Sequence, residues 1–348
     1  QVHQFVAEYT WVTSGDVTGS WIRSNKPIAV FGGNSCVFIP TNTMYCDHIV
    51  EQIPPTSTWG KEFVTVPLAS RANGDTFRVL AAEDDTHFQV NDQPAVTLSR
   101  GQFSEFILTE ASHIVADKPV LLAQYSHSFE FDYSAGADPF MMLVPPYEQF
   151  INDYIVMTPL SGFTWNYINI VAPEMAVGNL TLDGTAIPTE SFSPIGSSGF
   201  YRAQIAVDPG VHHLSSASPF GVFIYGYQNG PESYGYPGGS ALAQVANAAS
   251  LEVEVDASEQ GVGNQVCATA RVLDANSQGI PGVRIDFVVS GANSLAGSAF
   301  SDANGEALFC YSASNIGQDS LTARMSALQA VTQVLWMARI YMPLIWRP

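Results

Sequence analysis

The sequence predicts an all-β protein made of repeated β modules followed by a β-sandwich. Apolar residues alternate with other residues at Leu180 and Leu182 and again at Leu251, Val253 and Val255, which is the period of a half-buried strand. Glycine (28 residues) and proline (21 residues) separate such runs, as expected for tight turns between strands. The sequence contains no long stretch rich in Glu, Lys, Leu and Ala, so no amphipathic helix is predicted.

The charge balance excludes one class of partner. The formal net charge is −19, and Lys26, Lys61 and Lys118 are the only lysines. A nucleic-acid-binding surface needs a basic footprint, so we expect no nucleic-acid partner. The acidity is more simply interpreted as a solubility feature of an exposed surface.

The first two-thirds of the chain repeats itself at a period of about 92 residues. An apolar run led by proline begins at Lys26-Pro27 and returns at Lys118-Pro119 and at Ser218-Pro219. Other markers also share the period: Pro54-Pro55 with Pro145-Pro146, Val66-Pro67-Leu68 with Thr158-Pro159-Leu160, and the turn Asn91-Asp92 with Asp183-Gly184. Because proline lacks an N–H, we expect it to open each of these strands.

These markers predict the domain organisation. Residues 1–237 would contain a partial unit (1–53) and two full units (54–144 and 145–237), followed by a linker of small residues at 238–250. The first unit contains only the second half of the repeat. We therefore expect either that upstream residues were removed or that another segment completes its sheet, since open sheet edges are normally covered. The pattern leaves open whether the units form separate sandwiches or one body.

The four cysteines fall into two pairs that are local in sequence. Cys36 and Cys46 lie in the first unit, and Cys267 and Cys310 lie in the segment 251–338. An even count without Cys-x-x-Cys spacing favours disulfides and an oxidising compartment. The separation of the second pair suits a bridge between the two sheets of an immunoglobulin-like (Ig-like) sandwich.

The ends of the chain give weaker signals. No signal peptide is visible, and because the chain begins at Gln1 without Met, we expect it to have been processed. The apolar stretch from Ala330 to Trp346 is interrupted by Arg339 and Pro343, so we expect no membrane insertion there.

Short motifs in residues 1–237 occur in the order found in one known family. They are Asp16-Val17-Thr18-Gly19, Ser24-Asn25-Lys26-Pro27, Gly33-Asn34-Ser35-Cys36, Cys46-Asp47-His48-Ile49-Val50-Glu51-Gln52, Pro54-Pro55, Trp59-Gly60, Gln124-Tyr125, Asp138-Pro139, Glu148-Gln149 and Ser233-Tyr234-Gly235-Tyr236-Pro237. With these motifs the region resembles the IgGFc-binding protein N-terminal domain family. The resemblance implies an extracellular or adhesive protein, and it assigns no immunoglobulin-binding residue here.

A second set of motifs lies in residues 251–338. It comprises Ala270-Arg271-Val272-Leu273-Asp274, Gly279-Ile280-Pro281-Gly282-Val283, Ser301-Asp302-Ala303-Asn304-Gly305-Glu306-Ala307 and Leu321-Thr322-Ala323. This region resembles the group 1 bacterial Ig-like domain of the invasin and intimin type. The resemblance implies a spacer on a bacterial surface, without catalysis.

The residues that could carry chemistry have simpler structural interpretations. His48 with Asp47 and Glu51 could form a metal or acid–base site, but the loop next to Cys46 accounts for these polar groups as well. His212 and His213 are adjacent, so on a strand they would point to opposite faces. The acidic residues Glu83-Asp84-Asp85 and Asp302 lack EF-hand spacing. We therefore expect no catalytic residue, no metal and no cofactor.

Two aromatic or apolar sets are candidates for binding. Tyr225, Tyr227, Tyr234 and Tyr236 could stack on sugar rings, although strand packing or a subunit contact explains them more simply. The last ten residues, 339–348, carry six large apolar side chains: Ile340, Tyr341, Met342, Leu344, Ile345 and Trp346. Because burying each one is worth roughly 1.5–3 kcal/mol, we expect this tail to pack somewhere. It could insert as a strand into the incomplete first unit of a neighbouring copy, fold back on its own chain, or act as a cell-envelope attachment signal.

The sequence therefore predicts a non-enzymatic adhesion or structural protein that is secreted or displayed on a bacterial surface. Its partners would be other copies of itself in a head-to-tail fibre, or a protein or glycan on a host or neighbouring cell. The alternative is a monomeric glycan- or protein-binding receptor module.

Overall fold

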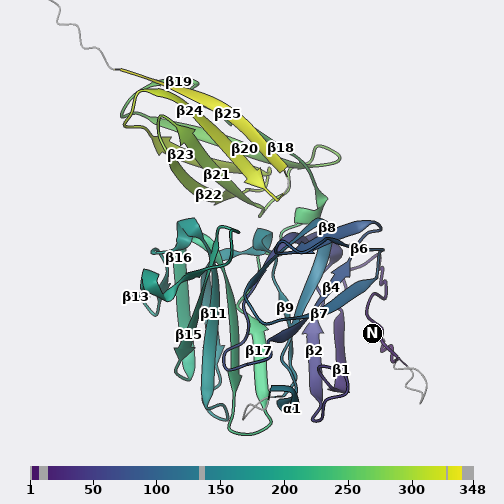
Figure 1. Cartoon of the computed structure of the whole chain (residues 1–348). Coiled ribbons are helices and arrows are strands. Elements are labelled where there is room, and N and C mark those ends of the chain that lie inside the picture. The colour runs from purple at the N-terminus through teal and green to yellow at the C-terminus, as the bar shows by residue number, and fades with distance from the viewer. Residues whose placement is uncertain (1, 8–14, 133–137, 327, 339–348) are drawn as a thin grey trace, which may run out of the picture.

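The computed structural model describes residues 2–7, 15–132, 138–326 and 328–338. Strands dominate these residues, and the predicted all-β class is confirmed. Strands β1–β17 form a lower part, called here the repeat body, and strands β18–β25 form an upper sandwich (Figure 1). The helical elements are α1 (Phe129–Asp132) and the short 3-10 helices η1 (Thr56–Thr58), η2 (Tyr147–Gln149), η3 (Glu174–Ala176), η4 (Thr189–Ser191) and η5 (Val245–Asn247).

Two sheets of the repeat body have the same connectivity around one long strand. In the first, β8 pairs with β3, β4, β5 and β9, and in the second β16 pairs with β10, β11, β12 and β17. The first sheet contains β3 (Gly60–Thr65), β4 (Asp75–Ala81), β5 (Thr86–Val90), β6 (Val96–Leu98), β7 (Phe103–Leu108), β8 (Ser112–Tyr125) and β9 (Met141–Val144). The second contains β10 (Ile151–Thr158), β11 (Trp165–Pro173), β12 (Thr181–Leu182), β13 (Thr185–Ala186), β14 (Ser193–Pro194), β15 (Phe200–Val207), β16 (Gly210–Tyr227) and β17 (Ser233–Pro237).

The long strands change partners part-way along. The first half of β8 pairs with β3 and β5, and its second half pairs with β4 and β9. The expectation that proline opens these strands is wrong, because Pro119 and Pro219 lie inside β8 and β16 near this change. The register shifts there, so a missing N–H costs the ladder little.

The two sheets share one hydrophobic core. It contains Phe77 and Leu122 from the first sheet together with Val171 and Phe223 from the second, all of them buried. The two sheets therefore form one body through this core.

The hairpin of β1 (Phe31–Val37) and β2 (Asp47–Gln52) forms a separate two-stranded sheet. It corresponds in the repeat to the end of β8 with β9, and to the end of β16 with β17. In Figure 1 the hairpin lies at one side of the repeat body, beside β9.

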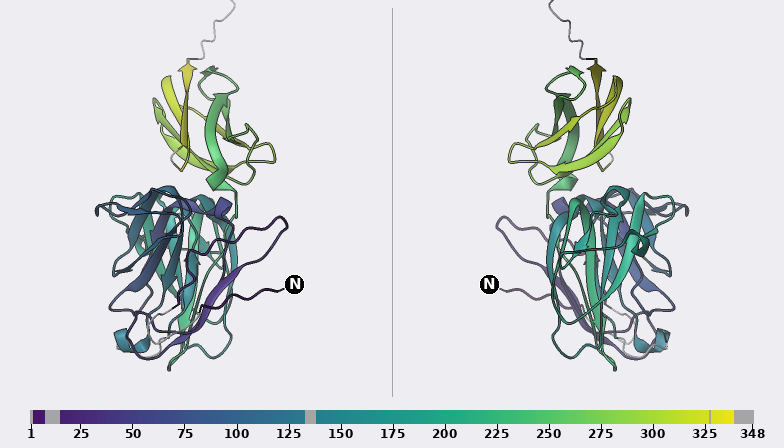
Figure 2. Two further views of the ribbon diagram at one scale, coloured as in Figure 1. Left: turned by 90° about the vertical axis from the view of Figure 1, so that its right-hand side faces the viewer. Right: turned by 90° about the vertical axis from the view of Figure 1, so that its left-hand side faces the viewer.

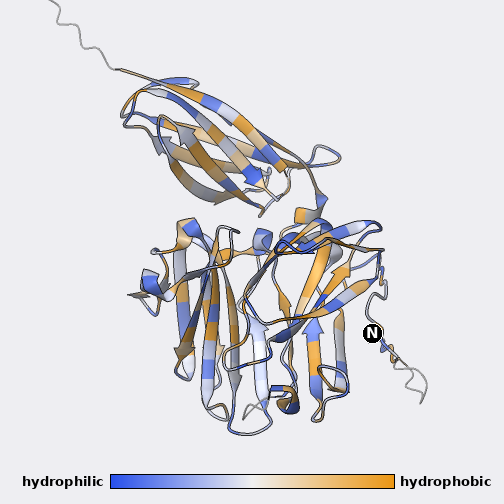
Figure 3. Ribbon diagram, viewed as in Figure 1, coloured by the Kyte–Doolittle hydropathy of each residue, from blue (hydrophilic) through white to orange (hydrophobic). Residues whose placement is uncertain are grey.

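The upper sandwich consists of a three-stranded and a five-stranded sheet, of orders β18-β20-β23 and β19-β25-β24-β21-β22. Hydrophobic and polar residues alternate along its strands (Figure 3), and the inward side chains form a second core around Phe287 and Trp336. The strands are β18 (Ala248–Val255), β19 (Glu259–Gly261), β20 (Gln265–Asp274), β21 (Arg284–Gly291), β22 (Leu295–Phe300), β23 (Glu306–Ser312), β24 (Gly317–Met325) and β25 (Leu328–Met337).

Both disulfides are present, but one differs from expectation in its placement. Cys36 joins Cys46, and Cys267 joins Cys310. Cys267 and Cys310 face each other on β20 and β23, which are neighbours in one sheet. The second disulfide therefore crosses two strands of the same sheet and does not bridge the two sheets.

The upper sandwich lies directly above the repeat body (Figure 2), and side chains pack across the junction between them. In the segment expected to be a plain linker, Ala243 is buried and exchanges two hydrogen bonds with the Gln149 side chain, of 2.7 and 2.8 Å. The guanidinium carbon of Arg284 lies 3.3 Å from the centre of the Tyr147 ring. Arg284 also donates to the Tyr147 carbonyl (2.8 Å) and to Asp286 (3.1 Å), and the Tyr147 hydroxyl donates to the same Asp286 oxygen (3.0 Å).

Candidate binding site at the first repeat unit

The β1–β2 hairpin carries exposed apolar side chains on one face. Phe31 on β1 is 65% exposed and Val50 on β2 is 56% exposed. Phe31 and Gly33 are on the same face of β1, and the register places Val50 opposite Gly33. The side chains of Phe31 and Val50 therefore lie on one face of the hairpin. Trp21 and Ile28, in the segment that leads into β1, are exposed as well. Together Ile28, Phe31 and Val50 are called here the hairpin apolar residues, whereas the Trp21 ring packs on Arg100, 5.2 Å from its guanidinium carbon.

The equivalent strands of the two full repeats are buried. One repeat period from Phe31 lies Ala123 on β8, and the corresponding residue of β16 is Phe223; both are in cores. Leu122 and Val222 on the opposite faces of those strands are buried too. The same part of the repeat is therefore an interior strand twice and an exposed strand once.

The inner side of the hairpin is firmly attached. Ile39 is buried against Ala123 and Tyr125 of β8. The Ser128 N–H donates to the Ile39 carbonyl at 2.7 Å, and the Met44 N–H donates to the Glu130 carboxylate at 2.6 Å. These contacts hold one face and one end of the hairpin, so the exposure of its other face comes from a fixed position.

Glu51 occupies the seam between β2 and β9. Its carboxylate accepts hydrogen bonds from the N–H groups of Leu143 and Gln52, but burial outweighs them and raises the pKa of Glu51 to about 7. Beside it lies a pocket of about 150 Å³. Its walls are mainly apolar and include Trp59, Leu143, Pro146 and Pro237. The pocket therefore has few polar groups that could orient a ligand.

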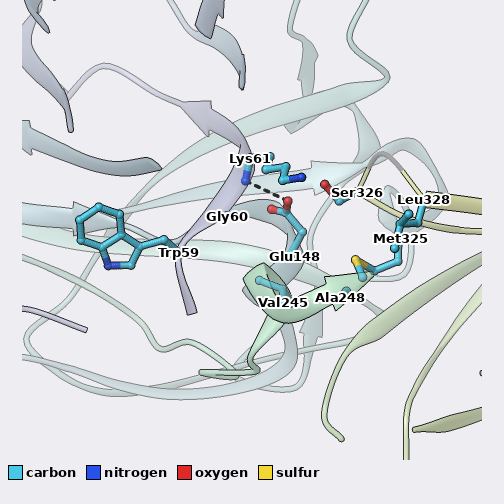
Figure 4. Close-up of a pocket in the computed structure, with 9 residues that line it drawn as sticks. All are labelled: Trp59, Gly60, Lys61, Glu148, Val245, Ala248, Met325, Ser326 and Leu328. Carbon is cyan, nitrogen blue, oxygen red and sulfur yellow. Dashed lines mark hydrogen bonds between the residues drawn. The ribbon is translucent and has the colours of Figure 1, made fainter. Parts of the chain in front are cut away.

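A second pocket lies at the junction of the repeat body with the sandwich (Figure 4). It measures about 60 Å³, which is room for about two water molecules. The Glu148 carboxylate accepts the Lys61 N–H at 3.0 Å there, and burial raises the pKa of Glu148. The pocket is therefore part of the packed junction and too small for a substrate.

The residues considered for catalysis or metal binding do not come together. His48 is 73% exposed at its side chain and contacts Asp47, whereas Glu51 points to the opposite, covered face of β2. His212 bonds Asp183 and His213 bonds Asp153. No group of three or more potential metal ligands occurs among the described residues.

The acidic turns have local structural roles. The Asp84 carboxylate accepts the Arg100 N–H at 3.0 Å. Asp302 accepts the N–H groups of Asn304 and Glu306 at 2.8 and 3.0 Å. The Asp302 bonds close a turn between strands, and the Asp84 bond joins two neighbouring turns.

The four tyrosines do not form an exposed ligand surface, and this alternative is corrected. Tyr225 is 0% exposed and Tyr227 is buried beside it in the shared core. Tyr234 and Tyr236 are half-buried, and their hydroxyls donate to Asn166 and to the Met157 carbonyl. Strand packing, the simpler interpretation, accounts for all four. The tail residues Ile340, Tyr341, Met342, Leu344, Ile345 and Trp346 lie outside the described residues.

Sequence reasoning missed a buried charged cluster between the two sheets. Arg71 forms an ion pair with Asp132 at 3.2 Å and donates to the His127 carbonyl at 2.6 Å. Burial raises the pKa of the neighbouring Asp75 to about 7, against the hydrogen bonds that it accepts and the Arg71 charge. Burial and the Arg71 charge lower the pKa of His127 to about 4. No periodic signal marks these residues, because Arg71 and His127 lie in connections, Asp132 ends α1 and Asp75 is only the first residue of β4.

Comparison with known proteins identifies the family. The model of the family described as IgGFc binding protein matches residues 1–226. The chain belongs to the IgGFc binding protein family. The human IgGFc-binding protein (Homo sapiens) is 27% identical over 225 residues, which are 62% of this chain and 4% of the human protein. The chain therefore spans a small part of this relative.

Solved structures of adhesins are similar only at a low level. The D0-D1 domain of intimin has a TM-score of 0.22 at 15% identity, covering 53% of this chain and 89% of its own. The Yersinia pseudotuberculosis adhesin InvE has a TM-score of 0.22 at 15% identity, covering 54% and 55%. The Escherichia coli adhesin FdeC has a TM-score of 0.22 at 13% identity, covering 80% and 98%. Similarity at this level carries no conclusion about this chain.

Within the part of the chain that the structure describes, no helix is long and apolar enough to cross a membrane.

Proposed function

We propose that this chain is a non-enzymatic adhesion protein of the bacterial cell surface or extracellular space, and that it binds another protein through its first repeat unit. The observation that carries the proposal is the exposed β1–β2 hairpin, whose counterparts are interior in the two full units. Apolar residues gathered on a surface mark an interaction site. Membership of the IgGFc binding protein family supports a protein as the partner, and the motifs of residues 251–338 support the bacterial surface setting.

The sequence best supports a second copy of the chain as this partner. The segment 339–348 is apolar and carries Arg339 and Arg347 without an acidic residue, whereas the whole chain has a net charge of −19. β25 runs from the junction to the far end of the sandwich, away from the hairpin (Figure 1). The segment that follows would therefore meet the hairpin of a neighbouring copy. Such a head-to-tail contact does not close on itself and builds a fibre.

Electron microscopy and sedimentation velocity test the assembly. The full chain is compared with a version that ends at Ala338, over a range of protein concentrations. We expect fibres or a ladder of oligomers from the full chain and monomers from the shortened one. Monomers from both would refute self-assembly. Binding of both versions to surface proteins or glycans would then favour the monomeric receptor.

A further inference from the structure

The hairpin presents a free β-sheet edge in addition to apolar side chains. In the antiparallel pair of β1 and β2, the Ile53 N–H donates to the Val30 carbonyl at 2.9 Å. Hydrogen-bonded pairs alternate with non-bonded pairs along such a ladder. The register of β1 with β2 therefore directs the backbone N–H and C=O of Gly32 toward β2, and those of Phe31 and Gly33 away from it.

The first full repeat shows what occupies this position when the unit is complete. The Ala82 N–H donates to the Pro119 carbonyl at 3.1 Å, and the register of β4 on β8 continues this bonding to Ala123 and Tyr125. Ala123 and Tyr125 lie one repeat period after Phe31 and Gly33. The backbone groups of β1 that point away from β2 are therefore equivalent in the repeat to the groups of β8 that bond β4.

The second full repeat shows the same arrangement. The Gly238 N–H donates to the Val222 carbonyl at 2.7 Å, so alternation directs the backbone groups of Phe223 and Tyr225 to the other side, where β11 pairs antiparallel with them. In both complete units an antiparallel strand covers the edge. Within the described residues β1 has β2 as its only ladder partner.

The edge of β1 also lacks the features that keep edges unpaired. Exposed strand edges are normally protected by lysine, proline, inward charges or bulges. Residues 29–33 read Ala-Val-Phe-Gly-Gly, without a charge or a proline. The register shift in β1 comes only between Asn34 and Val37, beyond the stretch in question.

We infer that the free edge of β1 is a strand-addition site, which accepts one antiparallel extended polypeptide strand from another chain in the register that β4 takes on β8. The added strand bonds Phe31 and Gly33 through its backbone, and its apolar side chains at alternate positions pack against the hairpin apolar residues. The inference rests on the proposed binding role of the first unit and names the structural class of its partner.

Two synthetic peptides probe the site, and amide hydrogen exchange reads it out residue by residue. One peptide has the sequence of residues 75–82, the strand that occupies the equivalent edge, and the other has the sequence of residues 339–348. The protein shortened to end at Ala338 serves as the acceptor. We expect the first peptide to slow exchange at Phe31 and Gly33 at least tenfold, with little change at Gly32, whose amide already bonds β2.

Two variants supply a matched control. Phe31→Asp places a charge beside the edge, and Ile316→Asp places one at an equally exposed apolar residue (64%) of the upper sandwich. We expect Phe31→Asp to weaken peptide binding at least tenfold and Ile316→Asp to leave it within twofold. Both side chains are exposed, so both variants should fold.

The outcomes separate this inference from the proposed function. Absence of protection at Phe31 and Gly33, protection before any peptide is added, or equal weakening by both variants would each overturn the inference. Protection by the first peptide but not by the tail peptide supports the edge site and refutes the tail as its occupant. Tail binding elsewhere, without protection of these amides, supports self-assembly and refutes the edge site.

Discussion

Replacing Arg284 by alanine is expected to destabilise the protein strongly through the junction. The side chain of Arg284 is 3% exposed. It contacts the Tyr147 ring, the Tyr147 carbonyl and the Asp286 carboxylate at once. The substitution removes the cation from above the ring and leaves Asp286 with the Tyr147 hydroxyl as its remaining partner across the junction.

The magnitude follows from burial. Breaking a buried ion pair by removing one partner costs about 3–5 kcal/mol, because the other charge stays behind without compensation. A desolvated cation–π contact contributes about 2 kcal/mol, and the two effects overlap because they share one guanidinium. We therefore expect a loss of about 3–5 kcal/mol in the free energy of unfolding. At an exposed pair of the same type, Arg271 with Glu306, solvent screening removes most of the gain, so Arg271→Ala should change stability far less.

Urea unfolding followed by near-ultraviolet circular dichroism measures both variants beside the parent chain. Hydrogen exchange at the N–H groups of Ala243 and Lys61, which lie in the junction and donate to Gln149 and Glu148, reports whether the loss begins there. Arg284→Met keeps the length of the side chain and separates packing from charge. The reasoning is refuted if Arg284→Ala costs no more than Arg271→Ala, or if exchange in the junction is unchanged.

Three other perturbations give distinct outcomes. Burial raises the pKa of Asp75 to about 7, so the native state keeps a proton that the unfolded chain has already released at that pH. The free energy of unfolding should therefore fall as pH rises from 4 to 7, by at most about 4 kcal/mol. Asp75→Asn should flatten this dependence on pH, and an unchanged slope would contradict the assignment. Replacing Cys267 and Cys310, which are 43 residues apart, by alanine should lower the free energy of unfolding of the oxidised protein by about 4 kcal/mol, measured in urea against the parent chain; equal stabilities would count against the entropic account. Asp319 accepts the indole N–H of buried Trp336 at 2.8 Å, so Asp319→Ala should cost at least about 3 kcal/mol by stranding buried donors, and thermal unfolding should show Asp319→Asn to be milder.

Much of the architecture could be predicted because it depends on local patterns. Alternating apolar residues and turn residues such as Asp183-Gly184 specify strands and hairpins over a few residues, and both turn residues have positive φ angles of 52° and 77°. The family motifs are short runs that can be found without a structure. Counting by the repeat period predicts in the same way that the first unit is partial, but it does not predict that its hairpin is exposed.

The placement of the functional surfaces could not be predicted in the same way. The tyrosines Tyr225 and Tyr227 have the composition of a ligand surface, but two sheets pack over them. The cysteines 267 and 310 suit either a bridge between sheets or a link within one sheet, and the strand order decides between these. Arg71 and Asp132 are far apart in sequence and meet because the first sheet brings the β3–β4 connection beside α1.

The sequence by itself determined the strands, the turns, the repeat and the pairing of the cysteines, because each depends on the periodicity, the glycines and prolines, or the cysteine spacing of a short segment. Only the tertiary structure decided which strands became interior. That outcome depends on how much apolar area the neighbouring sheets can cover. The second halves of β8 and β16 lie between partners and are buried, whereas β1 has, among the described residues, a partner on one edge only, and its Phe31 stays exposed.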